Sequence, residues 1–189
     1  MSQPIPGYLV TLQEAQAFLG GTMITDHHGI PIDFKYTDPI NPTKVQRIIY
    51  GSVLETYIRN HVLISALAKE IGVPPSFFIV LPEQLKAIQE AQELLVISVQ
   101  RTQFASLGDP GSVNRGKEGD CLVQGCHGPH PLRVVFGEVD TTRQKSILDD
   151  LVRLSKHMDV VEPLERLQSA LKSLYQEQRA RAHAPRPDA

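Results

Sequence analysis

The sequence has no tryptophan, only two cysteines and no long apolar run. No stretch approaches the roughly 18 consecutive apolar residues of a membrane-spanning helix, and the N-terminus MSQPIPGYLV lacks the basic and apolar regions of a secretion signal. The cysteines have only four residues between them, which excludes a disulfide framework linking distant segments. We therefore expect a cytoplasmic protein without a membrane partner.

Charge of neither sign predominates, since the net charge is -2. The sequence also lacks a nucleotide-binding glycine loop, a catalytic triad signature and a pair of acidic residues at a usable spacing. A chain of 189 residues with 41% hydrophobic and 21% charged residues is typical of one soluble globular domain. Because these motifs are absent, we predict no catalytic residues and favour a protein that is not an enzyme.

A β-hairpin is the strongest local signal. Apolar residues alternate with other residues from Ile30 to Tyr36, and the turn Asp26-His27-His28-Gly29 precedes them. Asp26 can accept backbone N–H groups within such a turn, and Gly29 can adopt a positive φ. Met23 to Thr25 would form the first arm.

The segment before the hairpin has two interpretations. Thr11 and Glu14 have the spacing of a capping box, and Leu12, Ala15, Phe18 and Leu19 share a helical face, which favours a helix ended by Gly20 and Gly21. The alternative is a single strand from Ala17 to Thr25 with a glycine bulge.

Later elements follow from periodicity and from the helix-stop residues. Apolar spacings of three and four predict helices at 43–50, 52–71, 82–93, about 142–154 and 161–179. Apolar or β-branched runs predict strands at 77–81, 94–99 and 131–139, with the last turns of the preceding helix as the alternative for 94–99. His61, on the apolar side of its helix, is interpreted as a core or boundary residue.

We therefore predict an α+β fold: a small, mostly antiparallel sheet, made of the β-hairpin plus two or three further strands, covered by helices on one side, with a C-terminal helix pair. Residues 1–178 would form the single domain, with a long loop at about 106–130, and residues 179–189 a disordered basic tail.

The long loop contains four residues that suit zinc. Cys121, Cys126, His127 and His130 lie within ten residues of one another, and thiolate and imidazole are preferred ligands of tetrahedral zinc. We interpret them as a candidate metal site, with zinc as the candidate cofactor. An exposed loop with incidental cysteines is the alternative.

The letters Asp26-His27-His28 resemble the motif of the DHH phosphoesterase family. The resemblance implies metal ions that activate water for phosphodiester cleavage. That family also has earlier carboxylates, whereas Glu14 is the only acidic residue among the 25 residues before Asp26. We interpret the motif as a polar turn.

Basic residues suggest contact with nucleic acid as a less favoured alternative. They are Lys35, Lys44, Arg47 and Arg59 around the hairpin and the next helices, and Arg115, Lys117 and Arg133 around the long loop. Only 6% of residues are aromatic, so few could stack on bases.

The functional hypothesis is therefore a non-catalytic, cytoplasmic protein-interaction module or an accessory subunit of a larger assembly, with another protein as its partner. The loop 106–130 and the last helix would be its contact surfaces, since Leu164, Leu167, Leu171 and Leu174 form a short coiled-coil seam. The alternative is a zinc-binding protein that contacts nucleic acid.

Overall fold

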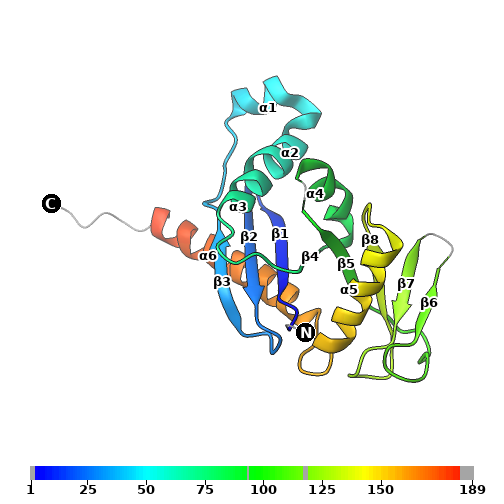
Figure 1. The fold of residues 1–189 in the computed structure, drawn as a ribbon. Helices are drawn as coiled ribbons and strands as arrows, with labels where there is room; N and C mark the ends of the chain where they lie inside the picture. The colour runs from blue at the N-terminus through cyan, green and yellow to red at the C-terminus, as the bar shows by residue number, and fades with distance from the viewer. Residues whose placement is uncertain (1–2, 93, 117–118, 184–189) are drawn as a thin grey trace.

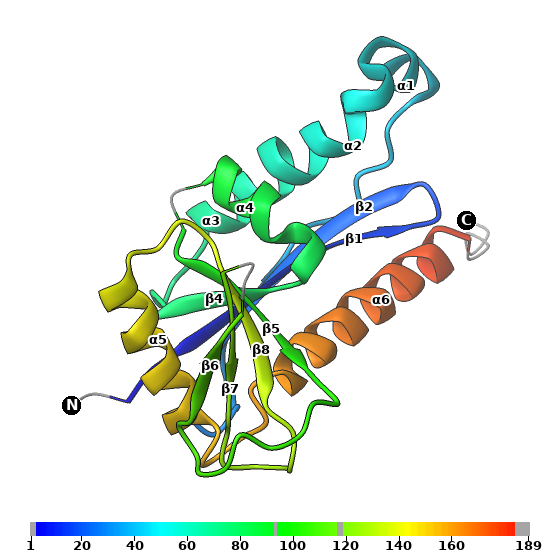
Figure 2. The ribbon, with the colours of Figure 1, turned by 90° about the vertical axis from the view of Figure 1, so that its right-hand side faces the viewer.

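The computed structural model describes residues 3–92, 94–116 and 119–183. These residues form an eight-stranded sheet with helices on both faces (Figure 1, Figure 2). The strands are β1 (Pro6–Glu14), β2 (Ala17–Thr25), β3 (Pro31–Tyr36), β4 (Phe77–Val80), β5 (Val96–Arg101), β6 (Val113–Arg115), β7 (Asp120–Val123) and β8 (Leu132–Phe136). The helical elements are α1 (Lys44–Tyr50), η1 (Gly51–Val53), α2 (Leu54–Thr56), η2 (Tyr57–Ile64), α3 (Ser65–Lys69), η3 (Pro82–Gln84), α4 (Leu85–Ala91), α5 (Thr141–Leu154) and α6 (Glu162–His183).

The strand order is β3-β2-β1-β4-β5-β8-β7-β6. β1, β4 and β5 run parallel to one another at the centre, and the remaining neighbours are antiparallel. The predicted small, mostly antiparallel sheet is therefore wrong, because the sheet is mixed and has eight strands. The hydrophobic pattern did not reveal how strands distant in the sequence pair.

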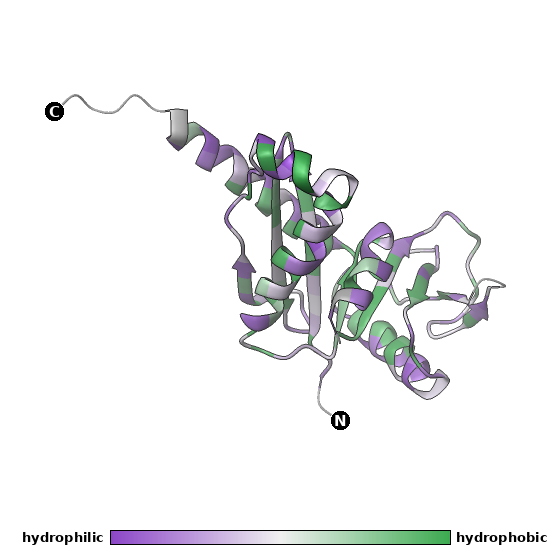
Figure 3. Cartoon of the chain, turned by 90° about the horizontal axis from the view of Figure 1, so that it is seen from above, coloured by the Kyte–Doolittle hydropathy of each residue, from purple (hydrophilic) through white to green (hydrophobic). Residues whose placement is uncertain are grey.

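Two hydrophobic clusters hold helices against opposite faces of the sheet. One cluster joins side chains such as Tyr8 and Val10 to α5 and α6, and the other joins Leu9 and Val80 to η2 and α4. Green and purple alternate along these helices in Figure 3, as expected for helices with one apolar side. The prediction of helices on one side of the sheet is wrong, since the central strands are buried on both faces.

The first two strands replace the predicted N-terminal helix. β1 pairs along its length with β2, and the turn between them places Ala15 at a φ of 53°. Burial on both faces removes the alternation by which an exposed strand is recognised, while Leu12 and Leu19 happened to have helical spacing. The alternative interpretation, a strand from Ala17 to Thr25, is confirmed, but its predicted glycine bulge is wrong, since Gly20 and Gly21 pair in regular register with Thr11 and Val10.

Helix packing explains the glycine pair in β2. A Cβ atom at Gly21 would lie 2.8 Å from Leu171 of α6, and one at Gly20 would lie 3.0 Å from Leu67 of α3. Helices thus approach the strand closely from both faces. The glycines provide this space and do not end a helix.

The predicted long loop contains β6 and β7, which extend the sheet beyond β8. α6 continues to His183, beyond the predicted start of the tail, and 184–189 lie outside the described residues.

The C-terminal helices do not form the predicted pair. α6 packs on β1 and β2, whereas α5 lies toward β7 and β8 (Figure 1). Within the described part of the chain, no helix is long and apolar enough to cross a membrane.

Candidate functional site

The candidate functional site lies at the carboxyl ends of the central parallel strands β1 and β4. In sheets of this type the carboxyl ends of parallel strands meet at one edge, which is where ligands bind in α/β folds. A cavity of about 480 Å³ opens there between η2, η3, α4 and α6. Its lining residues are Thr11, Leu12, Gln13, Glu55, Arg59, Asn60, Ile64, Leu81, Glu83, Gln84, Ala87, Ile88 and Gln168.

Gln84 closes the floor of this cavity. β4 ends at Val80, opposite Leu9, so the backbone of Thr11 has no strand partner on that side. The Gln84 amide replaces that partner: Thr11 N donates to Gln84 Oε1 at 3.1 Å, and Gln84 Nε2 donates to Thr11 O at 2.6 Å. Both residues are buried, so without Gln84 the N–H and C=O groups of Thr11 would each lose a hydrogen-bond partner away from water.

Arg59 forms one wall of the cavity. Its Nη1 lies 3.4 Å from Thr11 O and 3.3 Å from Thr11 Oγ1, and its Nη2 pairs with Glu55 Oε1 at 2.9 Å. Because the side chain of Glu55 is 55% exposed, this ion pair contributes little stability and can open at small cost. Opening this pair would leave Arg59 Nη2 for an anionic ligand, while Nη1 stays within hydrogen-bond distance of Thr11.

Asn60 supplies an unused amide. It is only 9% exposed and lines the cavity, and its side chain has no hydrogen-bond partner among the described residues. Arg59 and Asn60 both belong to η2, a π-helical segment, and such segments are rare and often occur at functional sites. The cavity thus contains one guanidinium and a free amide on adjacent residues.

The residues present do not fit a pair of catalytic metal ions. Two-metal hydrolysis needs several oxygen ligands converging on one point. β1 has a single acidic residue, Glu14, and of the two acidic residues that line the cavity, Glu55 pairs with Arg59 and Glu83 lies in η3. Among the residues that the structure describes, no group of three or more His, Cys, Asp or Glu side chains could hold a metal ion.

The cysteines of the predicted zinc site lie at separate positions. Cys121 lies in β7 with its side chain in the core, where burial raises the pKa of the thiol. Cys126 is half-buried, and its backbone N–H donates to Ser155 Oγ at 2.9 Å.

The histidines of the predicted site line a second cavity, of about 290 Å³, with Arg101 and Met158. His130 Nδ1 lies 2.8 Å from the carbonyl oxygen of Phe104. Since the structure gathers no three of the four predicted ligands, zinc binding by Cys121, Cys126, His127 and His130 stays a prediction.

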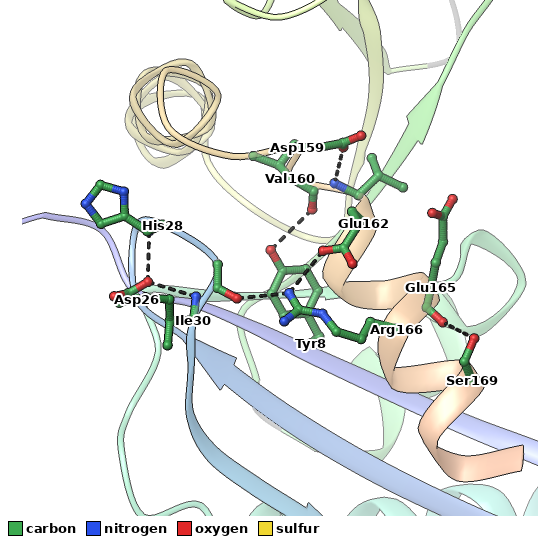
Figure 4. Close-up of polar contacts among 12 residues, drawn as sticks. Tyr8, Asp26, His28, Ile30, Asp159, Val160, Glu162, Glu165, Arg166 and Ser169 are labelled. Atoms are coloured by element: carbon green, nitrogen blue, oxygen red, sulfur yellow. Dashed lines mark hydrogen bonds and ion pairs between the residues drawn. The ribbon is translucent and has the colours of Figure 1, made fainter. Parts of the chain in front are cut away.

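Asp26 stabilises the β2–β3 turn, as predicted. Its Oδ1 accepts the backbone N–H groups of His28 at 2.8 Å and Ile30 at 2.9 Å (Figure 4). Although burial acts in the opposite direction, these hydrogen bonds hold the pKa of Asp26 below its ordinary value. The polar-turn interpretation of the DHH letters is confirmed.

A polar network fastens the start of α6 to this turn (Figure 4). Arg166 Nη2 donates to Gly29 O at 2.9 Å and pairs with Glu162 at 3.0 Å. Tyr8 Oη donates to Val160 O at 3.2 Å, and burial raises the pKa of this phenol well above its ordinary value. These contacts therefore stabilise the fold.

No protein-family model matches the sequence, and no curated protein matches it. Solved structures do match. Endonuclease V from Streptomyces avermitilis is 13% identical, with a TM-score of 0.59, over 94% of this chain and 85% of that one. The chain shares the fold of endonuclease V.

Two further solved structures have the same fold. Endonuclease V from Bacillus subtilis is 14% identical over 92% of this chain and 82% of that one, with a TM-score of 0.55. A variant of the Ciona intestinalis enzyme, solved with a 23mer DNA containing an inosine followed by a ribo-adenosine, is 10% identical over 92% and 86%, with a TM-score of 0.56.

The endonuclease V fold overturns the hypothesis of a non-catalytic protein-interaction module or accessory subunit, which rested on missing enzyme motifs. Asn60 and Gln84, which line the cavity, were not among the candidate site residues, and Thr11 was interpreted only as part of a capping box. The adjacent polar residues Arg59 and Asn60 within an apolar helix were the available signal, since they face a cavity and not solvent.

Proposed function

We propose that the protein binds nucleic acid and holds one nucleic-acid strand across the cavity at the ends of β1 and β4. The observation that carries this proposal is the position of Arg59 and Asn60 in a cavity at this edge of an endonuclease V fold. The Ciona protein with this fold was solved with DNA, which supports nucleic acid as the ligand.

The chemistry of the cavity suits a nucleotide. A guanidinium binds phosphate through charge-assisted hydrogen bonds, and Arg59 can do so when Glu55 moves into solvent. An asparagine amide offers a donor and an acceptor side by side, which match a base edge. Arg59 would thus bind the backbone and Asn60 a base.

Fluorescence anisotropy with labelled 20-nucleotide DNA and RNA tests the proposal. We expect saturable binding that weakens with salt, because each phosphate contact releases counterions. Arg59→Gln should weaken binding by roughly tenfold or more, while Lys156→Gln, an equal loss of charge on an exposed residue beyond α5, should not. Absence of binding to every oligonucleotide would refute the proposal.

Denaturing gels of the same mixtures test whether the bound strand is cut. The described residues do not fit a metal pair, so no metal-dependent step is assigned to them.

A further inference from the structure

The helical segment that begins at α1 exposes an unusually apolar surface. α1 buries none of its residues and lies at the far end of the molecule from the N-terminus (Figure 1, Figure 2). Contiguous exposed apolar patches commonly mark binding sites. The exposed side chains, here called the α1 surface, are Val45 (63%), Ile48 (71%), Ile49 (74%), Tyr50 (36%), Val53 (59%) and Tyr57 (41%).

Three rings follow one another beside this surface. The ring centroids of Tyr50 and Tyr57 are 4.9 Å apart, and those of Tyr57 and His61 are 5.7 Å apart. Their interplanar angles are 35° and 36°. His61 is exposed, which contradicts its interpretation as a core or boundary residue. The ladder therefore presents ring surfaces to solvent, of the kind on which bases stack.

The charge around the ladder suits a phosphate backbone. Residues 39–54 contain Lys44 and Arg47 and no acidic residue. A polyanion would thus meet only basic side chains along α1.

The ladder and the cavity share the helical segment η2. Tyr57 and His61 lie in η2 together with Arg59 and Asn60, which line the cavity. A nucleic-acid strand whose bases stack on the rings therefore needs to cross only η2 to reach the cavity.

We propose that the ring ladder of Tyr50, Tyr57 and His61 binds single-stranded nucleic acid by stacking on its bases. This inference rests on the proposed function and specifies its substrate class. Duplex bases are stacked on each other and cannot lie on the rings, whereas unpaired bases can.

Anisotropy with a 20-nucleotide single strand and its blunt duplex tests the inference. We expect the single strand to bind more tightly. Tyr57→Ala should weaken single-strand binding roughly tenfold, since each stacked base contributes about that much to affinity. Tyr57→Phe keeps the ring and should bind as the wild type does, and so should Phe104→Ala, which removes an exposed ring elsewhere.

Intrinsic fluorescence gives an independent readout. The protein has five tyrosines and no tryptophan, so its emission comes from tyrosine. Stacked bases should quench this emission in the wild type, and the quenching should fall in Tyr57→Ala.

Other outcomes separate the two proposals. If wild type and Tyr57→Ala bound the single strand with equal affinity, and Arg59→Gln still lost binding, the proposed role of the ring ladder would be wrong. The proposed function would still hold. No binding of any oligonucleotide would overturn both. A dimer that Ile49→Arg dissociates without changing oligonucleotide affinity would also overturn the ladder, since the α1 surface would then bind a second copy of the chain.

Discussion

Gln84 and Thr11 form two hydrogen bonds, and the Gln84 side chain continues the β-ladder where β4 stops. A side-chain amide has one donor and one acceptor, as a peptide unit does, so it can replace a strand residue. The pairing lets β1 extend past its parallel neighbour and gives the cavity a floor.

Gln84→Ala should lower the free energy of unfolding by about 1–3 kcal/mol, because the buried N–H and C=O of Thr11 would lose their partner. Urea denaturation measures this change. Gln13→Ala, on the exposed face at the end of the same strand, should change it by less than about 0.5 kcal/mol. Equal stability of the two variants would contradict the structural role of Gln84.

Gly7→Ala should destabilise the protein by about 1–3 kcal/mol. A Cβ atom at this position would lie 2.7 Å from two ring carbons of Phe78 and 2.9 Å from Pro75 Cγ. The smaller side chain of Phe78→Leu should recover part of the loss in the double variant, which a double-mutant cycle measures. Purely additive effects would mean that Phe78 is not the obstacle.

Acid should weaken the contact between β5 and the segment that leads from α5 into α6. Burial raises the pKa of Asp159, but hydrogen bonds from Arg101 and from the backbone of Val161 lower it more, so the net pKa lies below the ordinary 3.8. A carboxyl whose folded pKa is depressed stabilises the fold above its unfolded pKa, and this stabilisation is lost as pH falls through the folded pKa.

We therefore expect Asp159→Asn to be less stable than the wild type at pH 7, and the difference to shrink below about pH 4. The pair with Arg101 is about half-exposed, so the difference should be below about 1 kcal/mol. Urea denaturation across this pH range measures it. A difference that stayed constant down to pH 2 would show that the charge of Asp159 does not matter.

Chelation tests the zinc prediction. Since no three of Cys121, Cys126, His127 and His130 gather in the structure, we expect a chelator to leave the melting temperature unchanged. Metal that binds only the folded state would raise that temperature. A native mass increase equal to one zinc ion, absent from Cys126→Ser, would instead establish the zinc site.

Local chemistry determined several elements from sequence alone. The β2–β3 turn follows from the Asp26 carboxylate and from Gly29, whose φ is 79°. Likewise, the apolar run between Pro75 and Pro82 predicted β4, because proline cannot continue a ladder and marks its ends. These signals lie within a few residues of the element that they specify.

Other features depended on the tertiary structure. β1 was missed because both of its faces are buried, and such a strand lacks the alternation that distinguishes it from a helix. The β6–β7 extension was missed because two short strands in a polar segment become recognisable only when β8 pairs with them.

The sequence by itself therefore determined the turns, most helices and the exposed strand pattern, since these depend on neighbouring residues. Only the tertiary structure decided the strand order and the cavity. Thr11, Arg59 and Gln84 are distant in the sequence, and pairing of β1 with β4 is what brings them together. Nonlocal pairing of this kind leaves no periodic signal in a single sequence.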